Sequence, residues 1–294
     1  MADGKRECGV GVLFNPALAD FVSAHVGTLD YLAVIPDRFW VDRGIGRSPR
    51  FEETLAGEAV LAAAARSIPV VLHGIGLSIC SADVFDREYL AQLARWRHRY
   101  QCPWVSEHLS FSRIGVGHET NAAVALPVPY DHEILRMLYP RIETAQSMLA
   151  CPFLLENNVS YFTFADQELT EPAFLNNLTD VSGCSLLLDL HNVYTNARNH
   201  GFDAKAFLSK LNLSRVVEIH VAGGSEMMDF YTDSHTGPVA ADVWDLLSFV
   251  APRSPNLRGV TFEFHESTWP LLHNEGVLAQ LARARGALVA RCTA

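Results

Sequence analysis

Eight short runs of apolar residues, each followed by a helical pattern, constrain the fold of this chain more than any other feature. The runs are continuously apolar and rich in Val, Leu and Ile, which is typical of strands buried on both faces of a parallel sheet. Parallel neighbours need a crossover connection, and the intervening helices supply it. The predicted strands are Val10–Phe14, Tyr31–Ile35, Val70–Leu72, Trp104–Ser106, Phe153–Leu155, Ser185–Leu188, Val216–Ile219 and Val260–Phe262.

Eight strand–helix units predict closure into a TIM (β/α)8 barrel, with an open, doubly wound sheet as the alternative. The chain has 294 residues, and such a barrel typically needs about 250. No linker, low-complexity segment or composition shift divides the sequence. We therefore expect one α/β domain over residues 1–294, with the barrel core at about 9–285.

Helical patterns fill the spaces between these strands, and two longer stretches have neither pattern. The predicted helices start at Pro16 and then cover Phe51–Arg66, Val84–Tyr100, Asp131–Leu149, Pro172–Leu178, Ala204–Leu211, Val239–Val250 and Trp269–Arg285. The stretches Ser110–Pro129 and Gly223–Gly237 are expected to be irregular. Both follow strands, and long loops of compact domains are often functional.

Charge and cysteine usage exclude several classes of protein. The formal net charge is −10 and there is no run of Lys or Arg, which argues against nucleic acid and against an anionic membrane surface. The six cysteines are scattered without a CxxC pair, as expected for reduced thiols. The segment Met1–Glu7 is polar, and no apolar stretch approaches the length of about 20 residues that a membrane span needs. We expect a cytoplasmic protein.

Imidazole and carboxylate side chains follow the third to the eighth predicted strand. In a barrel the C-terminal ends of all strands meet on one rim, where active sites are built. His, Asp and Glu are the ligands that suit iron, zinc or manganese, and crowded carboxylates need cations. The eight candidates from this pattern are His73, His108, Glu156, Asp189, His220, Asp233, His235 and Glu263.

The number of candidates predicts more than one ion. A catalytic ion takes three or four protein ligands and keeps an open position, so eight ligands suggest two or three ions with a bridging carboxylate such as Glu156. Other polar residues near the strand ends have alternative interpretations. Glu218 can point outward to solvent, although His220, two residues on, shares its face. His191 and His265 can lie outside the ligand set.

At these residues the sequence resembles the multinuclear non-heme iron-dependent oxidative enzymes, a family that includes methanobactin- and 3-thiaglutamate-biosynthesis enzymes. The resemblance extends from about Gly9 to about Glu266. The segments that carry it, in this order along the chain, are His73–Ser78, Ser106–Phe111, Leu155–Asn157, Leu188–Tyr194, Glu218–Gly223 and Asp233–His235.

The resemblance implies a TIM barrel with two or three irons and O2-dependent oxidation of a residue, usually Cys, in a ribosomally made precursor peptide. It assigns His73, His108 and Glu156 to one iron. It assigns Glu156, Asp189, His220 and Glu263 to the next, and Asn192, Asp233 and His235 to a third. Two positions depart from the pattern. Many relatives have His where Gly224 stands, which puts a role of this position in a substrate loop or as an outer ligand in doubt. Many have Asn where His191 stands, which puts the third metal position in doubt.

Relatives of this kind often act with a small partner protein that binds the leader peptide, so we expect such a partner. A divalent-metal sugar isomerase or epimerase, or an apurinic endonuclease, is the alternative, because those barrels carry His and carboxylate ligands at the same rim. They use zinc, manganese or magnesium and no O2, and the acidic charge argues against the endonuclease. A catalytically inactive peptide scaffold is disfavoured, because the ligand set is intact.

Overall fold

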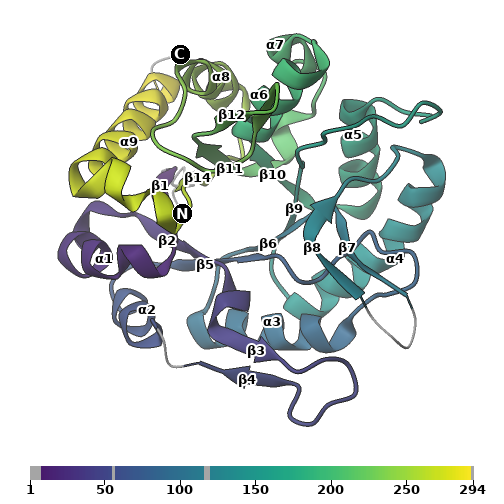
Figure 1. Cartoon of the computed structure of the whole chain (residues 1–294), viewed down its shortest axis with the longest axis horizontal. Helices are drawn as coiled ribbons and strands as arrows, with labels where there is room; N and C mark the ends of the chain where they lie inside the picture. Colours follow the sequence, from purple (N-terminus) through teal and green to yellow (C-terminus); the bar gives the residue numbers. More distant parts are fainter. Residues whose placement is uncertain (1–7, 55–56, 116–119, 293–294) are drawn as a thin grey trace, which may run out of the picture.

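The computed structural model describes residues 8–54, 57–115 and 120–292, so the segment Met1–Glu7 lies outside it. Eight parallel strands close into a barrel in the order β1-β14-β11-β10-β9-β6-β5-β2 (Figure 1). The predicted TIM barrel is therefore confirmed, and the open doubly wound sheet is wrong. The strands are β1 (Gly9–Phe14), β2 (Tyr31–Val34), β5 (Val70–Gly74), β6 (Val105–His108), β9 (Phe153–Glu156), β10 (Ser185–Asp189), β11 (Val216–Ala222) and β14 (Gly259–Glu263).

Helices surround this barrel on the outside (Figure 1). Their apolar faces cover the outward-pointing strand residues, as α4 shows by burying residues at helical spacing from Leu135 to Leu149. The α-helices are α1 (Ala19–His25), α2 (Glu58–Ala64), α3 (Arg87–Tyr100), α4 (His132–Leu149), α5 (Glu171–Ser182), α6 (Leu190–His200), α7 (Ala204–Leu208), α8 (Ala241–Val250) and α9 (Trp269–Cys292). Short 3-10 turns lie at Pro16–Leu18, Val26–Thr28, Pro36–Phe39, Leu213–Arg215, Ala251–Arg253 and Glu266–Thr268.

One predicted helix is wrong over its first part. Residues Phe51–Glu53 form β4, which pairs antiparallel with β3 (Trp40–Asp42), and α2 begins only at Glu58. The ring of Phe51 packs against that of Trp40 at 5.7 Å between centroids, so cross-strand contact outweighs helix propensity here.

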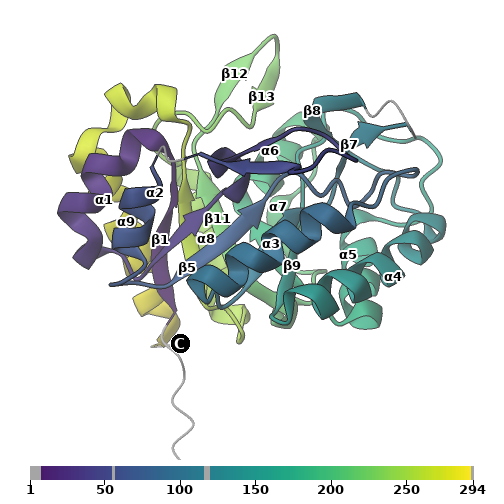
Figure 2. The same ribbon diagram turned by 90° about the horizontal axis from the view of Figure 1, so that it is seen from below.

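The two stretches expected to be irregular each contain a hairpin. Strands β7 (Phe111–Ile114) and β8 (Thr120–Leu126) pair after β6, and β12 (Ser225–Met227) pairs with β13 (Phe230–Thr232) after β11. The second hairpin projects from the barrel (Figure 2). Helix α6 was not predicted, because its sequence is largely polar. It begins directly after β10, where the Asp189 carboxylate accepts a hydrogen bond from the Asn192 amide at 2.7 Å.

The interior of the barrel changes from apolar to polar along the strands. Side chains two residues apart on a strand point to the same face. Val71, Leu154 and Leu187 belong to a buried interior cluster, and the residues two positions further along the same strands are His73, Glu156 and Asp189. The strands therefore place these polar side chains inside the mouth of the barrel, above a mostly apolar interior layer. No helix among the described residues is both long and apolar enough to cross a bilayer.

Candidate metal centre

The strand ends bring the predicted ligands into one buried cluster. Adjacent strands align His108 with Glu156 and Asp189 with His220, so each pair starts from neighbouring backbone positions. His73, Glu156, Asp189 and His220 are each at most 2% exposed. Polar groups this deeply buried need partners or a bound cation, so the cluster is expected to have a function.

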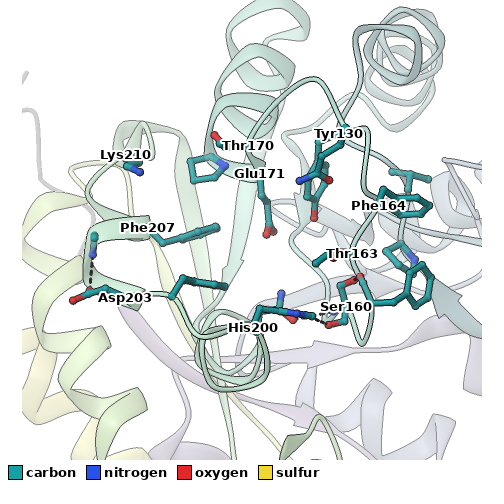
Figure 3. A pocket seen from close by; sticks show the side chains of 18 residues that line it. Tyr130, Ser160, Thr163, Phe164, Thr170, Glu171, His200, Asp203, Phe207 and Lys210 are labelled. Atoms are coloured by element: carbon teal, nitrogen blue, oxygen red, sulfur yellow. Dashed lines mark hydrogen bonds between the residues drawn. The ribbon is translucent and has the colours of Figure 1, made fainter. Parts of the chain in front are cut away.

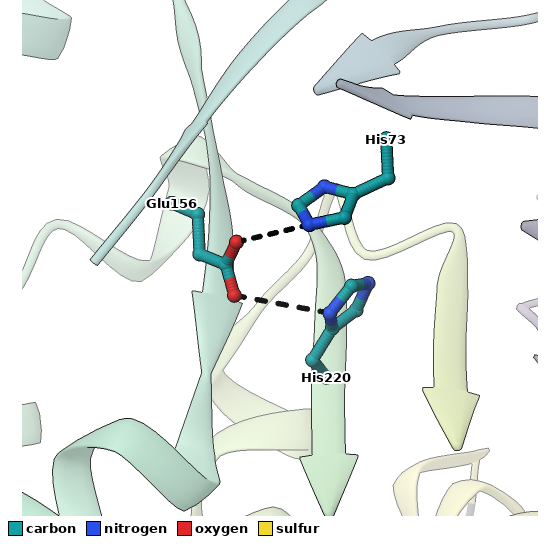
Figure 4. A group of neighbouring side chains, drawn as sticks. All are labelled: His73, Glu156 and His220. Carbon is teal, nitrogen blue, oxygen red and sulfur yellow. Dashed lines mark ion pairs between the residues drawn. The ribbon is translucent and has the colours of Figure 1, made fainter. Parts of the chain in front are cut away.

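Glu156 lies at the centre of a first group, in which two imidazoles face its carboxylate (Figure 4). His73 Nε2 is 3.3 Å from Glu156 Oε2, and His220 Nδ1 is 3.8 Å from Glu156 Oε1. The ligand atoms of these three residues all lie within 4.8 Å of one another, a spacing that one ion can bridge. His108 joins them, with Nε2 3.4 Å from Glu156 Oε2.

A second group shares His220 with the first. Asp189, His220 and Glu263 also have ligand atoms within 4.8 Å of one another. His220 Nδ1 lies 3.1 Å from Glu263 Oε2. Because His220 belongs to both groups, the geometry is that of adjacent sites with a common side chain.

The third predicted set lies further along the rim and connects to the second through Glu263. His235 Nδ1 is 3.3 Å from Glu263 Oε1, and His235 Nε2 is 2.7 Å from Asp233 Oδ1. Asn192 is buried in the first turn of α6, and its side-chain nitrogen Nδ2 donates to the carbonyl of Asn157 at 2.9 Å. The structure thus brings all nine predicted ligands to one end of the barrel.

The acids and imidazoles of the cluster shift one another's pKa strongly. Burial raises the pKa of Glu156 well above its usual value and that of Asp189 to about 7, with neighbouring carboxylates adding to both effects. Burial lowers the pKa of His73, and the nearby His108 and His220 rings add to this. A neutral imidazole is the form that binds a metal, and a bound cation would restore the ionised carboxylates.

Elsewhere in the cluster the attraction between opposite charges exceeds the cost of burial. Burial opposes protonation of His235, but Asp233 and Glu263 raise its pKa to about 10. Burial also disfavours the charged form of Glu263, yet His235 and His220 lower the pKa of that carboxyl far below its usual range. This side of the cluster therefore already pairs its charges within the protein.

Several buried acceptor atoms have no hydrogen-bond partner among the described residues. They include Oε2 of Glu156, Oδ2 of Asp189 and Oδ1 of Asn192. Buried polar atoms in native proteins are normally satisfied, and an unsatisfied group calls for a specific explanation such as an ion. All three oxygens belong to predicted ligands and face the cluster. Oxygen and imidazole donors without a thiolate fit iron, manganese or zinc.

Three other polar residues near the strand ends are not among the predicted ligands. Glu218 does not point to solvent: it is 1% exposed and lies one layer deeper in the barrel, where Trp104 and Thr261 donate to it at 2.7 and 2.6 Å. Its Oε1 also lies 3.4 Å from Nε2 of His220, so it adjoins the cluster from below. His265 is exposed and caps the turn that follows β14. Glu107 is buried on the other face of β6 and accepts from the amides of Leu77 and His108.

His191 lies against the third set, in space that Gly224 leaves open. Its Nε2 is 3.5 Å from Asp233 Oδ1, and its side chain is fully buried. A Cβ atom on residue 224 would come within 2.7 Å of His191 Cε1 and 2.5 Å of the Thr232 carbonyl oxygen. The two departures from the family pattern are therefore linked in space, because a side chain at 224 and the present position of His191 exclude each other.

A cleft of about 620 Å³ opens beside the cluster at His108, and sequence reasoning missed it. Its walls include β3 and the β7–β8 hairpin, held by a buried ion network. Asp86 Oδ2 lies 2.5 Å from Arg50 Nη2 and 2.6 Å from Arg113 Nη1. Asp86 caps the predicted helix α3, but Arg113 lies on β7 and Arg50 directly precedes β4, and neither strand was predicted. No sequence signal therefore joined these residues to the site.

The closed barrel of eight parallel strands, with a buried imidazole–carboxylate cluster at its mouth, places the chain among the TIM-barrel proteins. L-ribulose 3-epimerase has a similar fold (TM-score 0.58, 14% identity, 97% of this chain and 96% of that chain covered). So does a xylose isomerase domain protein from Alicyclobacillus acidocaldarius (0.57, 17%, 98% and 99%). Endonuclease IV from Thermus thermophilus is a third example (0.55, 15%, 95% and 99%). At these identities the likeness extends to the fold alone.

Within that class, the chain belongs to the family of the RiPP precursor modification enzymes MbnB/TglH/ChrH, whose model matches residues 9–286. Similar relatives are the UPF0276 protein of Caulobacter vibrioides (36% identity over 245 residues, 83% of this chain and 82% of the relative) and that of Rhizorhabdus wittichii (38% over 239 residues, 81% and 80%). The resemblance found in the strand-end motifs is thereby confirmed at the level of the family.

Proposed function

We propose that this enzyme binds two or three irons and uses O2 to oxidise a residue, in the first instance Cys, of a ribosomally synthesised precursor peptide. The observation that carries the proposal is the shared buried cluster with its unsatisfied oxygens on Glu156 and Asp189, in a chain whose family modifies such precursors. His73, His108 and Glu156 would hold one ion, and Asp189 and Glu263, with Glu156 and His220, the next. Asn192, Asp233 and His235 would hold a third.

Iron bound there would supply electrons for O2 and a Lewis-acid position that favours the deprotonated form of a substrate thiol. The chain's own residues provide the surroundings. The tightly packed layer below the cluster, which is mostly apolar and also holds Glu218, excludes water from one side. On the other side, the cleft beside His108 gives a peptide residue access to the cluster, and the His108 side chain is 25% exposed.

The direct test is incubation of anaerobically iron-loaded protein with its precursor peptide and O2, followed by mass spectrometry of the peptide. A short Cys-containing peptide encoded beside this gene is the first substrate to try, together with any small neighbouring protein as the leader-binding partner. We expect a discrete mass change that requires both iron and O2. An unchanged peptide mass, with substrate and partner verified, would contradict the oxidase proposal.

The alternative is a divalent-metal isomerase, epimerase or endonuclease on the same barrel. The same preparation separates the two functions, because the alternative predicts activity with zinc, manganese or magnesium under anaerobic conditions. A sugar or abasic-DNA substrate turned over without O2 would favour it. The net charge of −10 argues against DNA.

A further inference from the structure

A separate pocket of about 400 Å³ lies beside the metal centre, between the first turn of α5, α7 and the segment that follows β9 (Figure 3). Aromatic side chains from four parts of the chain line it. The volume is within the usual range for sites that take a small ligand or a large side chain. The rings are those of Tyr130, Phe162, Phe164, Phe202 and Phe207.

The carboxyl group of Glu171 points into the middle of this pocket (Figure 3). Burial raises its pKa to about 8, and Tyr130 hydrogen-bonds it. The pocket lining contains His200, whose Nε2 donates to the carbonyl of Ser160 at 2.5 Å. Asp203 and Lys210 occupy exposed positions of the lining and have opposite charges, and Asp203 already caps α7. The inner part of the pocket thus presents one carboxyl group among aromatic rings.

We propose that this pocket binds a cationic side chain, lysine or arginine, of the peptide substrate, with the aromatic rings around the cation and the Glu171 carboxylate as its counter-ion. Aromatic faces attract cations electrostatically, most strongly where water is excluded. A carboxylate that loses its proton as the cation enters pairs the buried charge. The overall charge of −10 also favours a basic peptide segment.

One face of α6 connects the pocket to the metal centre. Asn192, Asn196 and His200 recur at a spacing of four residues, and each hydrogen-bonds the backbone of the segment after Glu156. Asn192 donates to the Asn157 carbonyl, Asn196 donates to that of Asn158 at 2.9 Å, and His200 reaches Ser160. This ladder holds the pocket wall and the ligand-bearing segment as one unit.

The same helix gives the spacing between the two sites. Eight residues of α-helix, from Asn192 to His200, span about 12 Å. An extended peptide covers that distance in about four residues. A basic residue about four positions from the oxidised residue would therefore reach the pocket. This spacing rests on the proposed function, whereas the affinity of the pocket for cations does not.

The pocket is tested with small probes, independently of any oxidation. Ligand-observed NMR titrations would compare Nα-acetyl-lysine amide with Nα-acetyl-norleucine amide, which has a similar length but no charge. We expect the lysine probe to bind roughly tenfold more tightly. Glu171→Gln keeps the shape of the side chain but removes its charge, so the lysine and norleucine probes should bind with similar affinity. Ala206→Trp, on the lining of α7, should block both probes.

Leu271→Ala is the control, because it removes an exposed apolar side chain of α9 that is not part of the pocket lining. It should leave both affinities unchanged, and thermal denaturation verifies the fold of each variant. Equal or tighter binding of the norleucine probe, binding of neither probe, or lysine binding that survives Ala206→Trp would overturn the proposal.

A second experiment separates the pocket from the proposed oxidation. Replacing the basic residue about four positions from the oxidised residue by norleucine in a verified precursor should raise KM severalfold and leave kcat unchanged. An unchanged KM would refute the pocket as a substrate site while the oxidase function stands. Probe binding that depends on Glu171, with no peptide oxidised, would support the pocket and count against the oxidase function.

Discussion

Two layers of buried polar side chains lie one above the other inside the barrel, and they differ in how their atoms are satisfied. In the lower layer, Glu218 accepts hydrogen bonds from Trp104 and Thr261, and Tyr31 bonds Thr261 at 2.6 Å. In the upper layer, Glu156 and Asp189 each keep a buried oxygen without a hydrogen-bond partner among the described residues.

Burial alone therefore does not identify a functional carboxylate. Glu218 and Glu156 are both almost inaccessible, at 1% and 2% exposed. The protein supplies a full set of donors to one and surrounds the other with imidazoles and acids. A satisfied network stabilises the fold, whereas an unsatisfied cluster of ligand atoms points to an ion. Substituting each layer in turn tests this distinction.

Glu156→Gln should have the largest effect on function, because its carboxylate faces both His73 and His220. We expect iron bound per chain to fall below that of the wild type and peptide oxidation to drop by roughly a hundredfold or more. Metal analysis after anaerobic iron loading measures the first effect, and peptide mass spectrometry the second.

The matched change Glu218→Gln, one layer below, can keep an amide oxygen toward Nε2 of His220 and should retain its iron after loading with excess metal. The assignment of the two layers would be wrong if Glu156→Gln kept the iron content of the wild type while Glu218→Gln lost its iron.

Sequence patterns predicted the eight barrel strands because strands buried on both faces are continuously apolar. They also predicted which residues end those strands, and the geometry of a parallel barrel brings such ends together. The partners of Glu218 were not predictable in the same way. Tyr31 lies on β2, Trp104 directly before β6 and Thr261 on β14, far apart in the sequence, and only the register and inward pointing of these segments make them neighbours.

The hairpins and α6 were missed for local reasons. β3 and β4 have three residues each, too few for an alternating pattern, and β4 directly precedes Ala-rich helical sequence. Helix α6 starts directly after a predicted ligand, Asp189, whose side chain also caps the helix, and a pattern of apolar residues does not reveal such a cap. The cleft and the aromatic pocket depend on these elements and could not be predicted without them.

Glu218→Leu should have the largest effect on stability. It leaves the indole N–H of Trp104 and the hydroxyl of Thr261 buried without their acceptor. The free energy of unfolding should fall by about 2–4 kcal/mol. Urea denaturation of the metal-free protein measures it, with metal-free Glu156→Gln as the comparison. A larger loss of stability in Glu156→Gln would contradict the contrast between the layers.

Gly224→Ala should have a smaller effect on stability, confined to the surroundings of the third set of predicted ligands, Asn192, Asp233 and His235. The added Cβ meets His191 and the Thr232 backbone, so His191 must move away from Asp233 at a cost of about 1–3 kcal/mol. Gly286→Ala in α9 is the control, because its Cβ meets nothing within 4 Å. It should stabilise the helix by up to about 1 kcal/mol. Equal stability of the two variants would refute the contact with His191.

The last effect depends on pH and concerns Glu171, in the pocket rather than the barrel. Burial raises the pKa of Glu171 from 4.5 to about 8, so the folded state holds a proton that the unfolded state releases. Its contribution to stability is therefore greatest below pH 4.5 and is lost as the pH rises to about 8. Glu171→Gln should flatten the stability profile over this window, as measured by urea denaturation. An unaltered slope would contradict the raised pKa.

The central claim is that the upper layer holds iron ions which share Glu156. Mössbauer spectroscopy with an iron count, on wild-type protein loaded anaerobically and then partly oxidised, tests it most directly. The account predicts at least two irons per chain, with spectra of magnetically coupled sites. A single uncoupled iron, or a protein that binds none while remaining folded, would contradict it.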